Sequence, residues 1–133
     1  MNQKKLSVAV VDDDDSFARS LERLFRASGF EARTYASAEI FLASTTLPPP
    51  DCLVLDVKLG GMSGLDLQRQ LRKLGDSPPI IFVTAHDEPG VREQAQRMGC
   101  VAYFLKPVTR NSIIEAITRG VEQNRSESGG SDQ

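Results

Sequence analysis

The sequence has few cysteines, no excess of positive charge and no long hydrophobic run. Two cysteines, Cys52 and Cys100, occur among 133 residues, far apart and flanked by apolar residues. A disulfide framework or a thiolate metal site needs a denser pattern, so both thiols are expected to be free, buried and reduced. The formal net charge of −2 gives no reason to expect direct contact with a nucleic acid.

The chain also lacks the marks of membrane and exported proteins. No apolar run approaches the roughly 20 residues of a transmembrane helix, and residues 1–5 are too short and polar for a signal peptide. A cytoplasmic protein that does not contact the membrane is therefore expected. The length fits a single domain with one core, and the 40% hydrophobic and 26% charged residues are ordinary for a globular chain.

Segments with the pattern of buried strands alternate with amphipathic segments of helical period. The predicted strands are 6–11, 30–36, 51–56, 78–85 and 100–107. The predicted helices are 16–29, 37–45, 64–75, 88–99 and 109–123. This alternation predicts an α/β fold with a parallel sheet covered on both faces. The domain is expected to span residues 1–123, and the Ser/Gly-rich residues 124–133 to form a flexible tail or linker.

Four consecutive aspartates, Asp12 to Asp15, follow the first predicted strand. Like charges crowded at one strand end are costly unless a cation lies among them or solvent screens them. One interpretation is a charged turn in which Asp14 or Asp15 caps the next helix, whose dipole favours anions there. The other is a cation site formed by Asp12 and Asp13. The two interpretations are compatible.

Polar side chains stand at the carboxyl ends of four predicted strands. They are Asp12 and Asp13, Asp56, Thr84 and Lys106. In parallel α/β sheets, ligands bind at this edge. Clustered carboxylates suit a hard cation such as Mg²⁺, with Mn²⁺ as a substitute, and a lysine opposite the metal indicates an anion held between two positive centres. Phosphoryl transfer needs such a set, with a carboxylate that attacks in line.

The same segments resemble the receiver domains of bacterial two-component response regulators. The matching segments, in chain order, are VVDD (10–13), LVLD (53–56), MSG (62–64), VTA (83–85) and AYFLKP (102–107). A single match means little, but five in order, each near a strand end, are specific. The resemblance implies a flavodoxin-like, doubly wound, five-stranded parallel sheet of order 2-1-3-4-5 with five helices.

The resemblance also implies a role for each residue of the predicted site. Asp56 would accept a phosphoryl group from a sensor histidine kinase. Asp13, Asp56 and the main-chain carbonyl of Lys58 would ligate Mg²⁺ directly, while Asp12 would act mostly through water. Lys106 would pair with Asp56 before modification and hold the phosphoryl oxygens afterwards.

Two further residues would report the modification. Thr84 would hydrogen-bond the phosphoryl group, and Tyr103 would swing inward behind it. The bond between Lys106 and Pro107 would be cis, an isomer that proline makes accessible. The surface of residues 88–122 would then form a homodimer or dock an output domain. The segment SAEIFL (37–42) resembles receivers whose output is a DNA-binding helix-turn-helix domain, which here would lie beyond the C-terminus.

The sequence departs from the family pattern at three positions. Gly60 stands where a proline is usual, so the loop over the site is expected to be more mobile. Lys58, two residues beyond Asp56, replaces a side chain that is more commonly small or neutral, and His86 lies two residues beyond Thr84. We hypothesise that Lys58 and His86 tune the lifetime of the acyl phosphate. An exposed loop lysine and a surface histidine without this role are the alternatives.

The preferred hypothesis is a phosphorylation-dependent switch in transcription regulation. It would catalyse its own modification and hydrolysis, but it would turn over no separate substrate. A Mg²⁺-dependent hydrolase with an aspartyl-phosphate would place a second acid where Lys58 stands and would need cap insertions. A phosphorylation-independent binding module is disfavoured because Asp12, Asp13, Asp56 and Lys106 are all present. A flavodoxin-type flavin protein is excluded, since its Ser/Thr/Gly-rich phosphate loop is replaced by aspartates.

Overall fold

The computed structural model describes residues 5–44, 48–75 and 77–130, which form one five-stranded parallel sheet with helices on both sides. The strands are β1 (Ser7–Val11), β2 (Glu31–Tyr35), β3 (Cys52–Leu55), β4 (Ile80–Thr84) and β5 (Ala102–Leu105). The helices are α1 (Asp15–Ala27), α2 (Ala38–Ala43), α3 (Gly64–Leu74), α4 (Pro89–Arg97) and α5 (Arg110–Gly130). The strand order is β2-β1-β3-β4-β5, which confirms the predicted fold class and topology.

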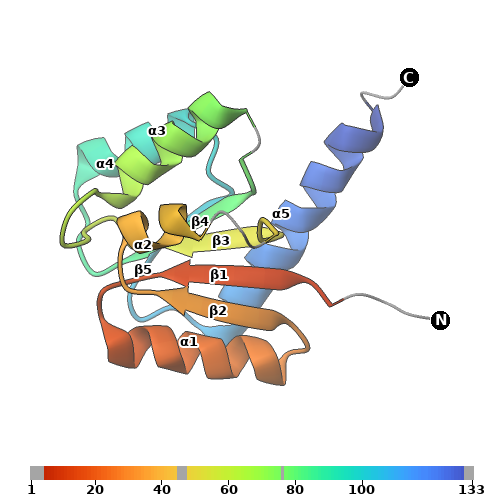
Figure 1. Ribbon diagram of the computed structural model, residues 1–133, viewed down its shortest axis with the longest axis horizontal. Coiled ribbons are helices and arrows are strands. Elements are labelled where there is room, and N and C mark those ends of the chain that lie inside the picture. The colour runs from red at the N-terminus through yellow and green to blue at the C-terminus, as the bar shows by residue number, and fades with distance from the viewer. Residues whose placement is uncertain (1–4, 45–47, 76, 131–133) are drawn as a thin grey trace.

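Two helical layers cover the two faces of the sheet. Helices α1 and α5 lie on one face, and α2, α3 and α4 lie on the other (Figure 1). Successive strand residues point to opposite faces. In β3, for example, Val54 packs toward α1 and α5, whereas Leu53 and Leu55 pack toward α3 and α4. Burial on both sides explains why β1, β3 and β4 are nearly continuous apolar runs in the sequence, unlike the more exposed β2 and β5.

The run of four aspartates divides between the start of α1 and the edge of the sheet. Asp14 is the N-cap of α1, and its Oδ1 accepts a hydrogen bond from the N–H of Phe17 at 3.2 Å. Asp15 lies in the first turn and pairs with Arg19 on the surface. The capping interpretation is therefore correct for the second half of the run, and Asp12 and Asp13 remain at the end of β1.

Helix α5 is longer than predicted. The sequence pattern places its end at residue 123, whereas the structure continues the helix to Gly130. The predicted role of residues 124–133 as a flexible tail or linker remains a prediction. Among the positions of α5 whose burial is described, up to residue 125, the last buried one is Val121, and the sequence beyond it has no apolar periodicity. Figure 1 shows this end of α5 extending past the sheet. The remaining tail, 131–133, lies outside the described residues. No helix in the described ranges has the length and apolar character needed to cross a bilayer.

The two cysteines provide a test of the packing. Neither is in a disulfide; Cys52 is fully buried in β3, but Cys100 is only partly buried. Burial raises the pKa of the Cys52 thiol to about 12 and that of Cys100 to about 11. Because the thiolate is the reactive species, we expect very slow alkylation of the native chain at neutral pH and rapid alkylation of both thiols in urea. Mass spectrometry counts the labels, and fast native labelling of Cys52 would contradict its burial.

Candidate functional site

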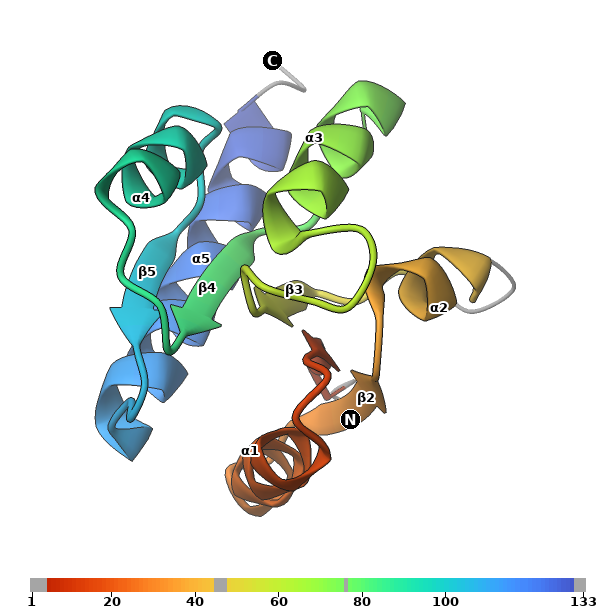
Figure 2. The same cartoon turned by 90° about the vertical axis from the view of Figure 1, so that its left-hand side faces the viewer.

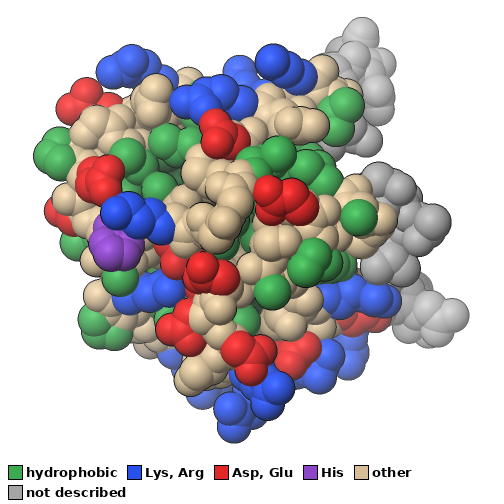
Figure 3. All heavy atoms as spheres, turned by 60° about the vertical axis from the view of Figure 1, so that its left-hand side comes forward, with side chains coloured by type: hydrophobic (Ala, Val, Ile, Leu, Met, Phe, Trp, Pro, Cys, Tyr) green, Lys and Arg blue, Asp and Glu red, His purple; other side chains and the backbone are tan. Residues whose placement is uncertain are grey.

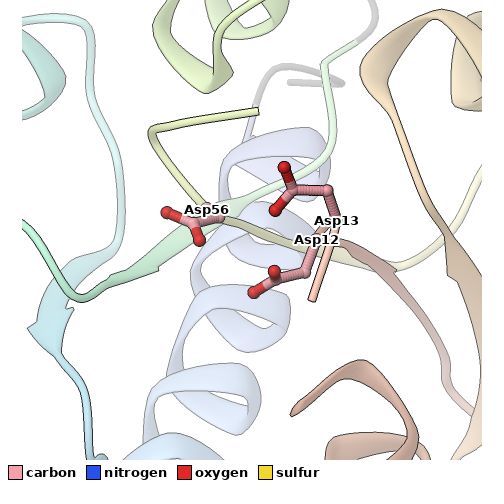
Figure 4. Close-up of side chains that lie close together, drawn as sticks. All are labelled: Asp12, Asp13 and Asp56. Atoms are coloured by element: carbon pink, nitrogen blue, oxygen red, sulfur yellow. The ribbon is translucent and has the colours of Figure 1, made fainter. Parts of the chain in front are cut away.

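The carboxyl ends of β1 and β3 bring three aspartates together. Val11 pairs with Leu55 in the parallel register, so Asp12 and Asp13 leave β1 beside Asp56, which follows β3. The N–H of Asp56 donates to the carbonyl of Val11 at 3.1 Å, which ties the two strand ends to each other. One carboxylate oxygen from each aspartate lies within 4.8 Å of the other two. Figure 2 looks onto this edge, and Figure 4 shows the three side chains projecting from it.

The three carboxylates differ in their exposure to solvent. Asp12 is 3% exposed and Asp56 is 7% exposed, while Asp13 is on the surface. Acidic side chains gather on the same face of the molecule in Figure 3. The cluster offers only oxygen atoms, and oxygen is the ligand type that Mg²⁺ prefers. The residues present therefore fit a hard divalent cation that approaches from the side of Asp13.

Lys106 supplies positive charge opposite the carboxylates. Its Nζ lies 2.9 Å from Oδ2 of Asp12 and 3.2 Å from Oδ2 of Asp56. The ammonium also lies 4.1 Å from the centre of the Phe17 ring, a cation–π contact. Burial by itself lowers the pKa of Lys106, but the hydrogen bonds and charges of Asp12 and Asp56 outweigh it and raise the pKa above its ordinary value. Lys106 is therefore charged at neutral pH and bridges two carboxylates.

Among the causes that shift the pKa of Asp12, burial is the largest. It raises the pKa of this carboxyl group, and the charge of Asp56 acts in the same direction. The N–H of Asp14, which donates to Oδ1 of Asp12 at 2.9 Å, and the bond from Lys106 lower the pKa by less. A raised pKa means that the fold resists the ionised form of Asp12. A single lysine does not balance the charge of three carboxylates, and a bound divalent cation would stabilise their ionised forms.

Thr84 ends β4 and is fully buried beside the cluster. Its Oγ1 accepts a hydrogen bond from the N–H of His86 at 3.2 Å, and its carbonyl accepts one from the N–H of Lys106 at 2.8 Å. The bond between Lys106 and Pro107 is cis, the isomer that the resemblance implies. The ends of β4 and β5 are therefore tied together, with the Thr84 hydroxyl and the Lys106 side chain at the same edge of the sheet.

Tyr103 lies in β5, packed between β4 and α4. Its ring centre is 5.9 Å from that of Phe82, and the guanidinium of Arg92 lies 5.1 Å from the ring centre. The hydroxyl is buried and has no hydrogen-bond partner among the described residues. Burial raises the pKa of Tyr103, and the charge of Arg92 opposes this. The ring is already packed inward here, so the predicted movement of Tyr103 remains a prediction.

Lys58 and His86 flank the site with exposed side chains. The N–H of Lys58 donates to Oδ1 of Asp56 at 3.3 Å, which orients the second oxygen of that carboxylate. The Lys58 ammonium lies 3.3 Å from Oε1 of Glu88, the residue that precedes α4. The side chain therefore reaches across to the β4–α4 loop. The predicted roles of Lys58 as a carbonyl ligand and of both residues in tuning remain predictions.

Sequence reasoning missed several residues that shape this site. Arg92 lies on the ring of Tyr103, and Glu88 forms an ion pair with Lys58. Glu39 accepts a hydrogen bond from the loop after β3. No periodicity or short motif marks such contacts, because the partners come from different elements. Gly64 belongs to the segment MSG (62–64), but the segment alone does not say why glycine is needed. The structure does, because a Cβ there would lie 2.2 Å from the carbonyl oxygen of Asp56.

The chain belongs to the response regulator receiver domain family, whose sequence pattern matches residues 8–118. A phosphorylation switch is the standard function of this family. The chain is 40% identical over 121 residues to nodulation protein W of Bradyrhizobium diazoefficiens, a match that covers 91% of this chain and 53% of that protein. It is 35% identical over 117 residues to the response regulator protein TodT of Pseudomonas putida, a match that covers 88% of this chain and 52% of TodT.

Solved structures place the chain in the same group. The response regulator StyR superposes with a TM-score of 0.84 at 36% identity, covering 97% of this chain and 65% of that chain. The N-terminal part of FixJ superposes with a TM-score of 0.81 at 33% identity, covering 90% and 96%. The chain spans about half the length of the curated relatives that it matches first. The family and fold are thus established, and relatives such as FixJ are transcriptional regulatory proteins.

Proposed function

We propose that this domain is a signalling switch that accepts a phosphoryl group on Asp56 with Mg²⁺ or Mn²⁺ bound beside it. The observation that carries the proposal is Lys106, which bridges Asp12 and Asp56 within a cluster of three carboxylates. A carboxylate acceptor, a cation site and a fixed ammonium are the parts that phosphoryl transfer to an aspartate requires. The membership in the receiver family supports the same assignment.

The geometry suggests how Asp56 is prepared for attack. Lys106 bonds Oδ2 and the N–H of Lys58 bonds Oδ1, so the carboxylate cannot rotate freely. One oxygen forms the new O–P bond while the N–P bond to a donor phosphohistidine breaks, and the histidine nitrogen keeps the electron pair. Asp13, Asp56 and the Lys58 carbonyl would hold the cation, with Asp12 acting through water. When bound, the cation would neutralise charge on the phosphoryl oxygens.

Lys106, Thr84 and Tyr103 would carry the modification to the surface. Lys106 would move from Asp12 toward a phosphoryl oxygen, and the Thr84 hydroxyl would donate to another. Tyr103 would then shift against Phe82, which changes the surface of residues 88–122. Such a switch is a population shift, and it needs the phosphoryl group to interact better with one of the two states.

The partners in this proposal follow from the family and the relatives. A sensor histidine kinase in the cytoplasm would donate the phosphoryl group. The regulated surface, residues 88–122, would form a homodimer or dock an output domain. A DNA-binding output domain beyond the C-terminus is supported by the relatives TdiR and FixJ, which are transcriptional regulatory proteins and of whose length the match covers 52% and 61%. The described residues themselves would make no specific DNA contact.

Intact mass after incubation with acetyl phosphate tests the acceptor. We expect the wild type to gain one phosphoryl mass only with Mg²⁺, and we expect Asp56→Asn to gain none. The matched control is Asp51→Asn, which changes an exposed aspartate that bonds Ser7 at the far end of the sheet. If no condition adds a phosphoryl group to the wild type, the chain acts as a phosphorylation-independent docking module instead. Slow turnover of acetyl phosphate without an accumulating adduct would favour the hydrolase.

A decay measurement tests the two side chains that flank the site. We expect the double variant Lys58→Ala, His86→Ala to lose its phosphoryl group at a rate different from that of the wild type. Both side chains are exposed, their backbone N–H groups bond Asp56 and Thr84, and they would flank the approach of water to Asp56. Phosphoryl content is followed by mass after acetyl phosphate is removed. Lys73→Ala, an exposed lysine at the end of α3, controls for loss of charge. Equal decay rates in the double variant and the wild type would dismiss the tuning hypothesis.

A further inference from the structure

The loop of residues 57–63 joins β3 to α3 beside the candidate acceptor. Its ends are closed by a hydrogen bond from the N–H of Gly64 to the carbonyl of Val57 at 2.9 Å. Between them, Lys58, Gly60 and Gly61 are exposed. Gly60 lacks the constraint of the proline that is usual at this position, and glycine is the residue with the largest backbone freedom. Something other than the intrinsic stiffness of the loop must therefore fix its course.

A side chain from a separate helix holds the backbone of this loop. Oε2 of Glu39, in the first turn of α2, accepts a hydrogen bond from the N–H of Met62 at 2.8 Å. Within the described residues, no other side chain from a different helix or strand bonds to the backbone of this loop. The same hydrogen bond is the largest cause of a lowered pKa at Glu39, so the carboxylate is ionised when it makes this contact.

Gly61 leaves the space that this carboxylate occupies. A Cβ at Gly61 would lie 2.6 Å from Oε2 of Glu39, which is too close for a real contact. A Cβ at Gly60 would meet nothing within 4 Å. The two adjacent glycines therefore differ, because only Gly61 permits the approach of Glu39 to the loop.

Glu39 itself is held on a helix that is anchored to the sheet. Its neighbour Ala38 is fully buried, and Phe41 packs edge to face on Tyr35 with ring centres 5.2 Å apart. The carbonyl of Tyr35 accepts a hydrogen bond from the N–H of Asp12 at 3.0 Å. The contact from Glu39 to the loop thus starts from a position that is tied to the acid cluster at the end of β1.

We propose that Glu39 is a positioning residue for the cation and phosphoryl site, acting through its hydrogen bond to Met62. It holds the loop in the course that would direct the Lys58 carbonyl toward a cation beside Asp56. This inference rests on the proposed function, because the Lys58 carbonyl matters only if a cation binds there. Glu39 touches neither the cation nor the acceptor.

Two measurements on the full chain test this role. The first is the Mg²⁺ concentration at which half of the Mg²⁺-induced rise in melting temperature is reached. The second is the rate of backbone hydrogen exchange, without metal, in a peptide that covers residues 57–63. For Glu39→Ala we expect a midpoint raised about tenfold, the low end of the loss that missing outer support causes at metal sites, together with faster exchange. Glu39→Gln keeps an oxygen that accepts from Met62, and it should restore much of both properties.

Gly61→Ala and Gly60→Ala form a matched pair in the same loop. We expect Gly61→Ala to behave like Glu39→Ala, because its methyl group displaces the carboxylate, and we expect Gly60→Ala to behave like the wild type. Combining Gly61→Ala with Glu39→Ala should add little, since both remove one interaction. Glu115→Gln on α5 controls for the loss of one surface charge.

The outcomes separate this inference from the proposed function. A normal Mg²⁺ response with an unchanged midpoint and unchanged exchange in Glu39→Ala overturns the positioning role alone. The positioning role is also overturned if Glu39→Gln has the same raised Mg²⁺ midpoint and faster exchange as Glu39→Ala, because the effect would then come from the lost charge. A wild type with no Mg²⁺ response and no phosphoryl gain overturns the proposed function and, with it, this inference.

Discussion

Replacing Lys106 by methionine is expected to lower the free energy of unfolding by about 3 kcal/mol in buffer without divalent cations. The Lys106 side chain is only 16% exposed, and it bonds two carboxylates that are almost fully buried. Methionine fills a similar space but leaves Asp12 and Asp56 without a counter-charge. Breaking a buried pair in this way is more harmful than replacing the whole pair, because an uncompensated charge remains. Urea denaturation followed by circular dichroism measures the change.

Two further measurements identify the cause of the lost stability. Adding Asp12→Asn to Lys106→Met should recover a large part of the stability, since the second change removes the buried charge that the first left unpaired. Excess Mg²⁺ should also raise the urea midpoint of Lys106→Met. An unchanged midpoint in Lys106→Met alone would mean that the cluster is hydrated and needs no lysine.

The pH dependence of the Lys106→Met effect has a definite sign. At the alkaline end, the raised pKa of Lys106 means that its contribution is fully present below its unfolded value of 10.5 as long as its carboxylate partners are ionised, and is lost as pH rises through its folded value. At the acidic end, Asp12 becomes neutral as pH falls through a folded pKa that lies above 3.8. The difference in stability between wild type and variant should therefore be largest from neutral to mildly alkaline pH and should shrink toward both extremes.

Gly64→Ala is expected to destabilise the chain by about 2 kcal/mol or more and to slow acceptance of a phosphoryl group severely. The new methyl would lie 2.2 Å from the carbonyl oxygen of Asp56 and 3.2 Å from Cε1 of Phe82. Backbone, not a mobile side-chain end, occupies the closer position, so the start of α3 or the turn that carries Asp56 must move. Either movement displaces the carboxylate from Lys106. Urea denaturation and acetyl phosphate labelling measure the two effects.

Gly60→Ala is the matched control for Gly64→Ala, because its methyl would meet nothing within 4 Å. It should leave the stability and the labelling nearly unchanged. A Gly64→Ala variant with wild-type stability and labelling would show that the turn after β3 can relax without cost, and the close approach to Asp56 would then have no functional meaning.

Much of the fold was predictable because its signals are local. Strands buried on both faces must be apolar throughout, so β1, β3 and β4 stand out in the sequence as short apolar runs. The carboxyl ends of parallel strands meet at one edge, which predicted that Asp12, Asp56 and Lys106 would be neighbours. The end of α5 was not predictable in this way, because residues 124–130 continue the helix without an apolar pattern.

The sequence by itself determined the order of the elements, the edge at which the polar side chains meet and the capping of α1 by one of the two aspartates Asp14 and Asp15. These follow from hydrophobic periodicity and from interactions between residues close in the chain. Only the tertiary structure decided that Lys106 bonds both Asp12 and Asp56, that Arg92 lies on Tyr103 and that Glu39 holds the loop at Met62. Each of these contacts joins residues from separate elements, and its geometry depends on how whole layers pack rather than on any local pattern.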